Sequence, residues 1–366
     1  MNQDRYVAYV GTYTHGSSIG IHVYDLDVEQ GYMTERNVIP VNNASHIAKS
    51  NNGNYLYSIA DEGVEVLKID ENGDLTAINK VGIDGMRGCF LSTDIEGKRL
   101  FVAGYHDGKI TVVRIHRNGR LGSVMDGIFH KGLGSVAERN FRPHVSCAMP
   151  TPDGKYLCVV DNGIDQIKLY TVHPTTGQLK LLDIIRCELE SGPRLIRFSR
   201  DGKYAYVICE LSNEILVYTY DGSDKHPQFE LIQTVSTVMD ENESGCAASG
   251  LRISPSGKYL YCSTAGDNTA GVFAIDQNTG MLEQLFILPI SGKYPKDVAV
   301  FPDERTLVVL NHESNSICFF RIDYEKKVMV MHGKPIKIET PNCILISKVN
   351  EQLELRENLM KKEENS

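Results

Sequence analysis

Charged side chains in short loops between apolar runs are the first candidates for chemistry in this sequence. His144, Arg194 and Glu210 together supply groups that could activate a water molecule and hold an anionic oxygen, as a hydrolysis reaction needs. A histidine or a glutamate can take a proton from water, and an arginine can hold an anionic oxygen by charge-assisted hydrogen bonds. Further loop residues that could bind a negatively charged small molecule are Arg139, Arg142, Asp161, Lys296, Asn311 and His312.

The same residues also have structural interpretations, which the pattern leaves open. His144 can be a histidine at the edge of a strand that bonds a backbone carbonyl. Arg194 and Glu210 can pair with each other as a structural bridge. Lys296 and His312 can be solvated loop residues. The position of His144 beside a recognisable motif, described below, favours a functional role for it.

Patterns for metals and cofactors are missing from the sequence. The histidines and cysteines show no ligand spacing such as His-x-x-x-His with a nearby acid, and no Gly-Lys-Ser/Thr phosphate loop occurs. Glu210 and Asp161 alone are too few acidic ligands for a metal-dependent site. We therefore expect chemistry without a metal and without a cofactor.

A repeated phrase indicates which elements position these residues. An apolar run, a tight turn with glycine and a Tyr/Leu-rich run recur, with the turn glycine at positions 53, 97, 154, 202 and 257. A further copy, Asp303-Glu304-Arg305-Thr306-Leu307-Val308, lacks the glycine. Another strand-like run, a turn and a fourth short run follow each copy. Each unit therefore holds about four antiparallel strands, and the uneven spacing of the units places insertions in loops.

Units of this length with four strands and regular glycine turns are typical of an all-β fold, the β-propeller. Six units carry the phrase, and both ends together supply a seventh: residues 6–33 give strand-like runs, and residues 342–346 give one more strand. The sequence therefore predicts a seven-bladed β-propeller, its ring closed by strands from both termini. We expect residues 1–349 to form one domain and residues 350–366 to form a charged tail.

The strand order predicts which loops share a face of the propeller. In an antiparallel sheet, the loop that leads into the first strand lies on the same face as the loop between the second and third strands. On that face we expect the loops 139–144, 161–163, 191–194, 210–212, 265–267, 292–296 and 311–313. Residues that converge over a channel are the default expectation for a binding site, so this face should carry it.

The chain resembles the seven-bladed propeller lactonases, a family that contains one type of 6-phosphogluconolactonase and the fungal carboxy-muconate lactonizing enzyme. The resemblance extends from residues 9–14 through Pro341. The motifs that carry it are His130-Lys131-Gly132 leading into Pro143-His144, Asp161-Asn162-Gly163-Ile164-Asp165, Ser191-Gly192-Pro193-Arg194, Cys209-Glu210-Leu211 and Leu310-Asn311-His312. The resemblance implies that His144, Arg194 and Glu210 line the active site.

Several positions depart from the family pattern. The histidine after Gly-Pro-Arg is Leu195 here, and the residue expected to supply a second pocket arginine is Ala265. An acidic residue often found just before the fifth central strand is Gly250, and the arginine of a Pro-Arg step is Lys296. These departures leave the fold unchanged and bear on the substrate and the activity.

Composition and charge limit the partners. The 366 residues carry a formal net charge of −9, and no block of Lys and Arg occurs before the last residues, so we expect no nucleic-acid partner. No apolar run approaches the roughly 18 residues of a membrane helix, and the polar start of the chain does not resemble a secretory signal. The 9 cysteines, an odd number without a Cys-x-x-Cys pair, indicate free thiols in a reducing compartment, the cytoplasm.

Three functions follow as hypotheses. The first is hydrolysis of an anionic sugar-acid lactone, 6-phosphogluconolactone, by metal-free acid–base chemistry, with Arg139, Arg142 or Lys296 holding the phosphate. The second is a non-catalytic propeller that binds a ligand or a protein, which the changes at Leu195 and Ala265 would fit. The third is a muconate-type cycloisomerase, which needs several cations and is weakened by the missing arginine. The sequence does not indicate the oligomeric state.

Overall fold

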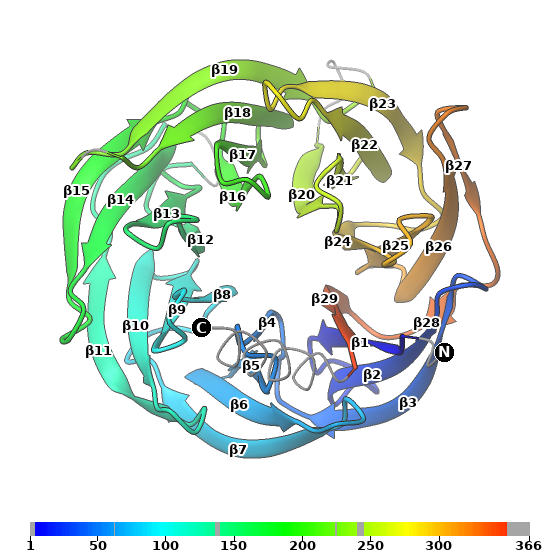
Figure 1. The fold of residues 1–366 in the computed structure, drawn as a ribbon, viewed down its shortest axis with the longest axis horizontal. Helices are drawn as coiled ribbons and strands as arrows, with labels where there is room; N and C mark the ends of the chain where they lie inside the picture. Colours follow the sequence, from blue (N-terminus) through cyan, green and yellow to red (C-terminus); the bar gives the residue numbers. More distant parts are fainter. Residues whose placement is uncertain (1–3, 62, 136–139, 224, 240–244, 350–366) are drawn as a thin grey trace, which may run out of the picture.

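Strands are the regular secondary structure of the described part of the chain. The computed structural model describes residues 4–349, except 62, 136–139, 224 and 240–244. Within these residues the strands form seven antiparallel sheets, and no helix occurs. Figure 1 shows the sheets as a ring round a central axis, each with one strand nearest the axis. The predicted seven-bladed propeller is therefore confirmed.

Strands from both ends of the chain close the ring, as predicted. From the axis outward, this sheet consists of β29 (Pro341–Lys348), β1 (Tyr6–Thr12), β2 (Gly20–Asp27) and β3 (Tyr32–Pro40). β29 pairs antiparallel with β1, with Tyr9 opposite Leu345. Figure 1 shows β29 next to the axis beside β1. This pairing covers the strand edges that an open ring would expose.

The other six sheets follow one another along the chain and share one antiparallel order. From the axis outward, three of them are β4 (Ile47–Lys49), β5 (Tyr55–Ala60), β6 (Gly63–Ile69) and β7 (Leu75–Gly82); β8 (Phe90–Thr93), β9 (Arg99–Gly104), β10 (Lys109–Ile115) and β11 (Leu121–Phe129); and β12 (Val145–Pro150), β13 (Leu157–Asp161), β14 (Gln166–Val172) and β15 (Leu179–Arg186). The other three are β16 (Pro193–Phe198), β17 (Tyr204–Cys209), β18 (Glu214–Asp221) and β19 (Gln228–Ser236); β20 (Ala247–Ile253), β21 (Tyr259–Ala265), β22 (Thr269–Ile275) and β23 (Leu282–Pro289); and β24 (Pro295–Val300), β25 (Thr306–Asn311), β26 (Ser316–Asp323) and β27 (Val328–Met331), with β28 (Ile336–Lys337) also on β26.

The repeated glycine has a backbone reason. Gly154 lies between β12 and β13 with φ of 69°, in the left-handed region that glycine enters without steric penalty, and its N–H donates to the Thr151 carbonyl oxygen at 2.9 Å. In the copy without glycine, Glu304 takes the same place with φ of 59° and donates to the Phe301 carbonyl oxygen. The turn is therefore the same in both copies, with or without glycine.

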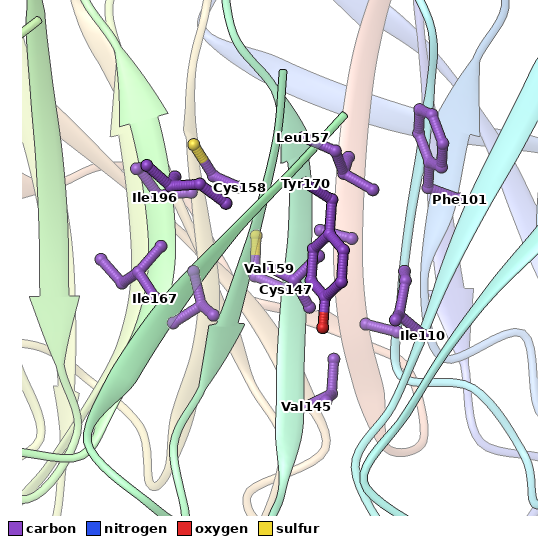
Figure 2. Close-up of a cluster of buried hydrophobic side chains, with 14 of the residues drawn as sticks. Phe101, Ile110, Val145, Cys147, Leu157, Cys158, Val159, Ile167, Tyr170 and Ile196 are labelled. Atoms are coloured by element: carbon purple, nitrogen blue, oxygen red, sulfur yellow. The ribbon is translucent and has the colours of Figure 1, made fainter. Parts of the chain in front are cut away.

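The core lies between neighbouring sheets. Figure 2 shows one such contact, where Phe101 of β9 and Ile110 of β10 face Leu157 and Tyr170 of the next sheet. Phe101 and Ile110 are at most 1% exposed, and burying each such side chain contributes about 1.5–3 kcal/mol. Packing on both sides of each sheet fixes the innermost strands, which hold the site residues.

Candidate active site

A cavity of about 550 Å³ lies where the innermost strands begin, on the face predicted from strand order. We call this the mouth face: it carries the loops that lead into the innermost strands and the loops between second and third strands. All seven sheets or their adjoining loops contribute to the lining; one residue from each is Asn342, Ser45, Phe90, His144, Arg194, Arg252 and Lys296. The cavity thus gathers side chains that lie far apart in the sequence.

Five of the expected site residues meet in this cavity. The lining includes Arg142, His144, Arg194, Glu210 and Lys296. Arg194 and Lys296 lie at the starts of β16 and β24. Arg142 and His144 lie in the loop before β12, and Glu210 directly follows β17. The strand-order argument therefore placed these residues on one face correctly.

His144 directly precedes β12 and is held in one orientation. Its Nδ1 lies 2.8 Å from the carbonyl oxygen of Tyr105, so Nδ1 carries the proton and donates it. The ring stacks on Tyr105 with centroids 4.4 Å apart and meets the edge of Phe141 at 6.4 Å. Among the described residues no group bonds Nε2. The backbone contact of the structural interpretation is thus present, and it leaves Nε2 able to accept a proton.

Arg194 and Glu210 form an ion pair in the cavity wall. Nη1 of Arg194 donates to Oε2 of Glu210, and the two side chains are 22% and 7% exposed. Burial opposes the charge on Arg194, but Glu210 outweighs burial and raises the pKa of the guanidinium. The N–H of Glu210 donates to the Gly192 carbonyl oxygen at 2.7 Å, which ties the loop after β17 to the loop before β16. Since a guanidinium has five N–H donors, Arg194 retains donors for a ligand.

Asp161 supports His144 from behind the cavity wall. Its Oδ1 accepts the backbone N–H of His144 at 2.8 Å, and its Oδ2 lies 2.7 Å from Nδ1 of His130. The Tyr170 hydroxyl lies 3.1 Å from Nε2 of His130. The structure thus gives Asp161 a positioning role in place of the expected substrate contact, because its side chain is fully buried and both oxygens have protein partners.

The loop that begins at Asp161 also joins two neighbouring sheets. Asn162 Nδ2 donates to the Gly192 carbonyl oxygen at 3.0 Å, and Asp165 Oδ1 accepts the Gly192 N–H at 2.8 Å. Gly163 packs so tightly that a Cβ there would lie 1.8 Å from the Arg142 carbonyl oxygen. The motif Asp-Asn-Gly-x-Asp therefore acts as a brace that sets the relative positions of His144 and Arg194.

Buried His130 makes stability depend on pH. Burial lowers the pKa of His130 below its ordinary value of 6.5, although Asp161 opposes this shift. The unfolded chain therefore takes up a proton near pH 6.5 that the folded chain does not, so the folded state is favoured above that pH and loses stability as pH falls through it. We expect the free energy of unfolding, measured with urea, to fall between pH 7.5 and 5.5.

The variant His130→Gln isolates this contribution. It should be less stable than the wild type at pH 7.5, because it loses the bond to Asp161, yet its stability should change less between the two pH values. Other buried histidines, His46 among them, contribute equally to both proteins and cancel in the comparison. An identical pH slope in wild type and variant would contradict the assignment.

The remaining expected substrate contacts lie beside the cavity or outside the described residues. Asn311 is fully buried, with Nδ2 3.2 Å from Sγ of Cys318, so it packs inside its sheet. His312 meets the edge of Tyr13 at 5.6 Å, and burial lowers its pKa. Neither side chain is part of the lining. Arg139 lies outside the described residues.

A second group with hydrolase-like geometry lies outside the cavity. Ser18 Oγ is 3.3 Å from Nε2 of His22, whose Nδ1 is 2.7 Å from Oε2 of Glu35. Ser18 is only 6% exposed, and its hydroxyl is also bonded to Thr12 Oγ1, which donates to the Gly20 carbonyl oxygen. Because Thr12 Oγ1 gives its proton to the Gly20 carbonyl oxygen, the Ser18 hydroxyl donates its own proton to Thr12 Oγ1 and directs none to His22. The group therefore reads as a structural network.

Sequence reasoning missed several polar residues of the cavity, among them His46, Arg197 and Arg252. The arginines lie within innermost strands, β16 and β20, whose other residues are mostly apolar. A charged residue within an otherwise apolar innermost strand was the sequence feature that could have indicated them. Arg197 and Arg252 also add positive charge to the cavity. The cavity therefore holds further arginines even though Ala265 stands where the family pattern has one.

The departures from the family pattern have different outcomes. Leu195 lines the cavity, so the loss of a histidine there makes the wall more apolar. A Cβ at Gly250 would lie 2.9 Å from Ser263 Oγ and 3.2 Å from the Asp297 Cα, so an acidic side chain has no room. Ala265 is 1% exposed and outside the lining. Of these departures, Leu195 and Lys296 therefore change the surface that a ligand would meet.

The described residues hold no group of three or more His, Cys, Asp or Glu side chains that could bind a metal ion. In the same part of the chain, no helix has the length and apolar character needed to cross a membrane. All nine cysteines are free thiols, and six of them are buried.

Known proteins share this organisation along almost the whole chain. The family model described as "Lactonase, 7-bladed beta-propeller" matches residues 7–346. The 6-phosphogluconolactonase of Bacillus subtilis is 33% identical over 346 residues, which cover 93% of this chain and 98% of that protein. The periplasmic gluconolactonase of Pseudomonas aeruginosa has a solved structure with a TM-score of 0.88 at 26% identity, covering 94% of this chain and 99% of that one. The chain therefore belongs to the family of seven-bladed β-propeller lactonases.

Proposed function

We propose that the protein hydrolyses 6-phosphogluconolactone to 6-phosphogluconate, with His144 as the general base. The observation that carries the proposal is the fixed imidazole in the cavity, whose Nδ1–H donates to the Tyr105 carbonyl oxygen. Arg194 lines the same cavity. The similarity to the 6-phosphogluconolactonase of Bacillus subtilis supports the substrate class.

The reaction consumes one water and moves one proton at a time. Nε2 of His144 takes a proton from water while the oxygen attacks the lactone carbonyl carbon, and Arg194 stabilises the oxyanion that forms. Collapse of this intermediate breaks the bond to the ring oxygen, which takes the proton back from His144. The products are a hydroxyl group and a carboxylate, with one proton released to solvent.

His144 fits the role of base better than Glu210. Oε2 of Glu210 is engaged by Arg194, and the Glu210 side chain is 7% exposed. The main role of Glu210 is then to hold Arg194 in place. We propose that the chemistry needs no metal, that the protein acts in the cytoplasm, and that residues 1–349 form one domain; the tail, 350–366, lies outside the described residues.

The test is turnover of two lactones that differ only in the phosphate. Fresh 6-phosphoglucono-δ-lactone and glucono-δ-lactone are hydrolysed with EDTA present, and spontaneous opening is subtracted. The proposal expects turnover of the phosphorylated lactone to be faster at equal concentration. Faster turnover of the unphosphorylated lactone would move the substrate towards that of the gluconolactonase relative. If neither lactone is hydrolysed, the result would favour the hypothesis of a non-catalytic propeller that binds a ligand or a protein.

A second candidate is the muconate-type cycloisomerase, which one observation favours. Arg194, Arg197 and Arg252 all line the cavity, and a dicarboxylate needs several cations. The same assay separates the two candidates when a muconate diacid is offered and lactone formation is followed. Cyclisation of the diacid without hydrolysis of a sugar lactone would favour the cycloisomerase.

A further inference from the structure

Two arginines lie deeper in the cavity than the proposed catalytic group. Along β16, Arg197 lies three residues beyond Arg194, roughly 10 Å further from the mouth face at ~3.3 Å per residue. Arg252 lies near the far end of β20. Both arginines line the cavity, and we call the part that they line its floor. A ligand therefore meets cations at the floor that are separate from Arg194 at the mouth.

The positive charge of Arg197 is not matched by a partner in the described structure. Arg252 binds Asp297 through two bonds, Nε to Oδ1 at 3.2 Å and Nη2 to Oδ2 at 2.6 Å. Arg197 instead donates to the Ile196 carbonyl oxygen at 2.9 Å and bonds the Cys147 thiol, both neutral groups. Burial and the nearby Arg252 lower its pKa, yet a guanidinium stays protonated. Two cations against one carboxylate leave the floor with an excess positive charge.

Neutral donors stand beside this charge. Nδ1 of His46 accepts the Leu91 N–H at 3.1 Å, so the proton of the neutral ring lies on Nε2. Burial, with Arg252 and Arg197 nearby, holds the pKa of His46 well below 6.5 and keeps the ring neutral. Phe90 packs against both groups: its ring centroid is 4.3 Å from that of His46 and 5.3 Å from the Arg197 guanidinium carbon.

The neighbouring Ser45 is an independent sign of a ligand. Ser45 is 2% exposed and lines the cavity, and its Oγ has no hydrogen-bond partner among the described residues. A buried hydroxyl without a partner is unfavourable, so a water, an ion or a ligand that bonds it would be stabilising. Ser45 directly precedes His46 in the chain, so both donors belong to one wall of the cavity.

We propose that Arg197, the Nε2–H of His46 and the Ser45 hydroxyl form an anion subsite that holds the phosphate monoester of the substrate. Arg197 lies deeper along β16 than Arg194, so the phosphate enters first and the lactone carbonyl stays near the mouth. This proposal rests on the proposed function for the identity of the substrate. It replaces the expectation that cations at the mouth hold the phosphate.

Arg142, at the mouth, is less suited to this task. Arg142 is exposed, and its guanidinium carbon lies 5.8 Å from the Phe141 ring centroid. Salt and water screen an exposed charge, whereas a charge in the floor of a cavity acts through a lower dielectric. Arg142 therefore contributes to attraction of the anion more than to its final position.

The test measures binding of the stable product rather than turnover. Calorimetry gives the dissociation constants of 6-phosphogluconate and gluconate, which differ only in the phosphate. We expect the wild type to prefer 6-phosphogluconate, and Arg197→Met to weaken that ligand roughly 10- to 100-fold with little effect on gluconate. Ser45→Ala should weaken 6-phosphogluconate several-fold. Arg186→Met, an exposed arginine on the outer strand β15, is the matched control and should bind both ligands as the wild type does.

The outcomes separate this proposal from the proposed function. An unchanged preference in Arg197→Met, or its loss in Arg142→Met alone, would overturn the subsite whether or not the protein hydrolyses lactones. Equal binding of both ligands by the wild type would also overturn it. Phosphate-selective binding through Arg197 without hydrolysis would keep the subsite and remove the lactonase proposal. If Arg197→Met does not fold, Ser45→Ala carries the same comparison.

Discussion

Replacing His144 with alanine is expected to lower kcat for lactone hydrolysis by about 10²–10⁴-fold with a small change in KM. The imidazole acts on the water molecule in the transition state, and substrate binding depends on other groups. The loss should be incomplete, because Arg194 still stabilises the oxyanion. The measurement is the initial rate of opening of 6-phosphoglucono-δ-lactone, with the spontaneous rate subtracted.

The controls for this prediction test position and protonation separately. His226→Ala removes an exposed histidine from a surface loop and should leave kcat unchanged. His144→Gln keeps a hydrogen-bonding side chain without a base of similar strength, so it should behave as the alanine variant does. Turnover that survives both His144 substitutions would assign the base to another group of the cavity.

The fold could be predicted because its signal is local and repeated. Each turn between the first two strands of a sheet needs a left-handed residue, and Gly154 supplies it as the other turn glycines do. Glu304 adopts the same left-handed conformation without being glycine. The sequence identifies that copy of the repeat by its flanking residues alone. Pairing of β29 with β1 was predictable because six units leave unpaired strands at both ends.

The site could be predicted only in part, for physical reasons. Strand order fixes the face of a loop, and this is enough to group His144 with Arg194. It does not fix the direction of a side chain, so Asp161 and Asn311 were expected in the cavity although both point into the protein. The direction of Arg197 depends on the register shift between Pro193 and Leu195, which no sequence pattern announces.

Replacing Arg194 and Glu210 together is expected to separate their structural role from their catalytic role. Glu210→Met alone leaves a partly buried guanidinium without its carboxylate, which should lower the free energy of unfolding by up to about 3 kcal/mol. Arg194→Met alone removes the cationic partner of the more deeply buried carboxylate, with a similar effect. The double variant leaves neither charge, so its loss of stability should be smaller than the sum of the two single losses.

Activity should not recover together with stability. If Arg194 stabilises the oxyanion, the double variant regains much of its stability but keeps a kcat roughly 10²–10³-fold below wild type. If the pair is only a structural bridge, kcat follows stability and returns towards the wild-type value in the double variant. Urea unfolding and initial rates on the same four proteins give both quantities. A double variant that is stable and active would remove Arg194 from the catalytic site, and the oxyanion would then need another donor in the cavity wall.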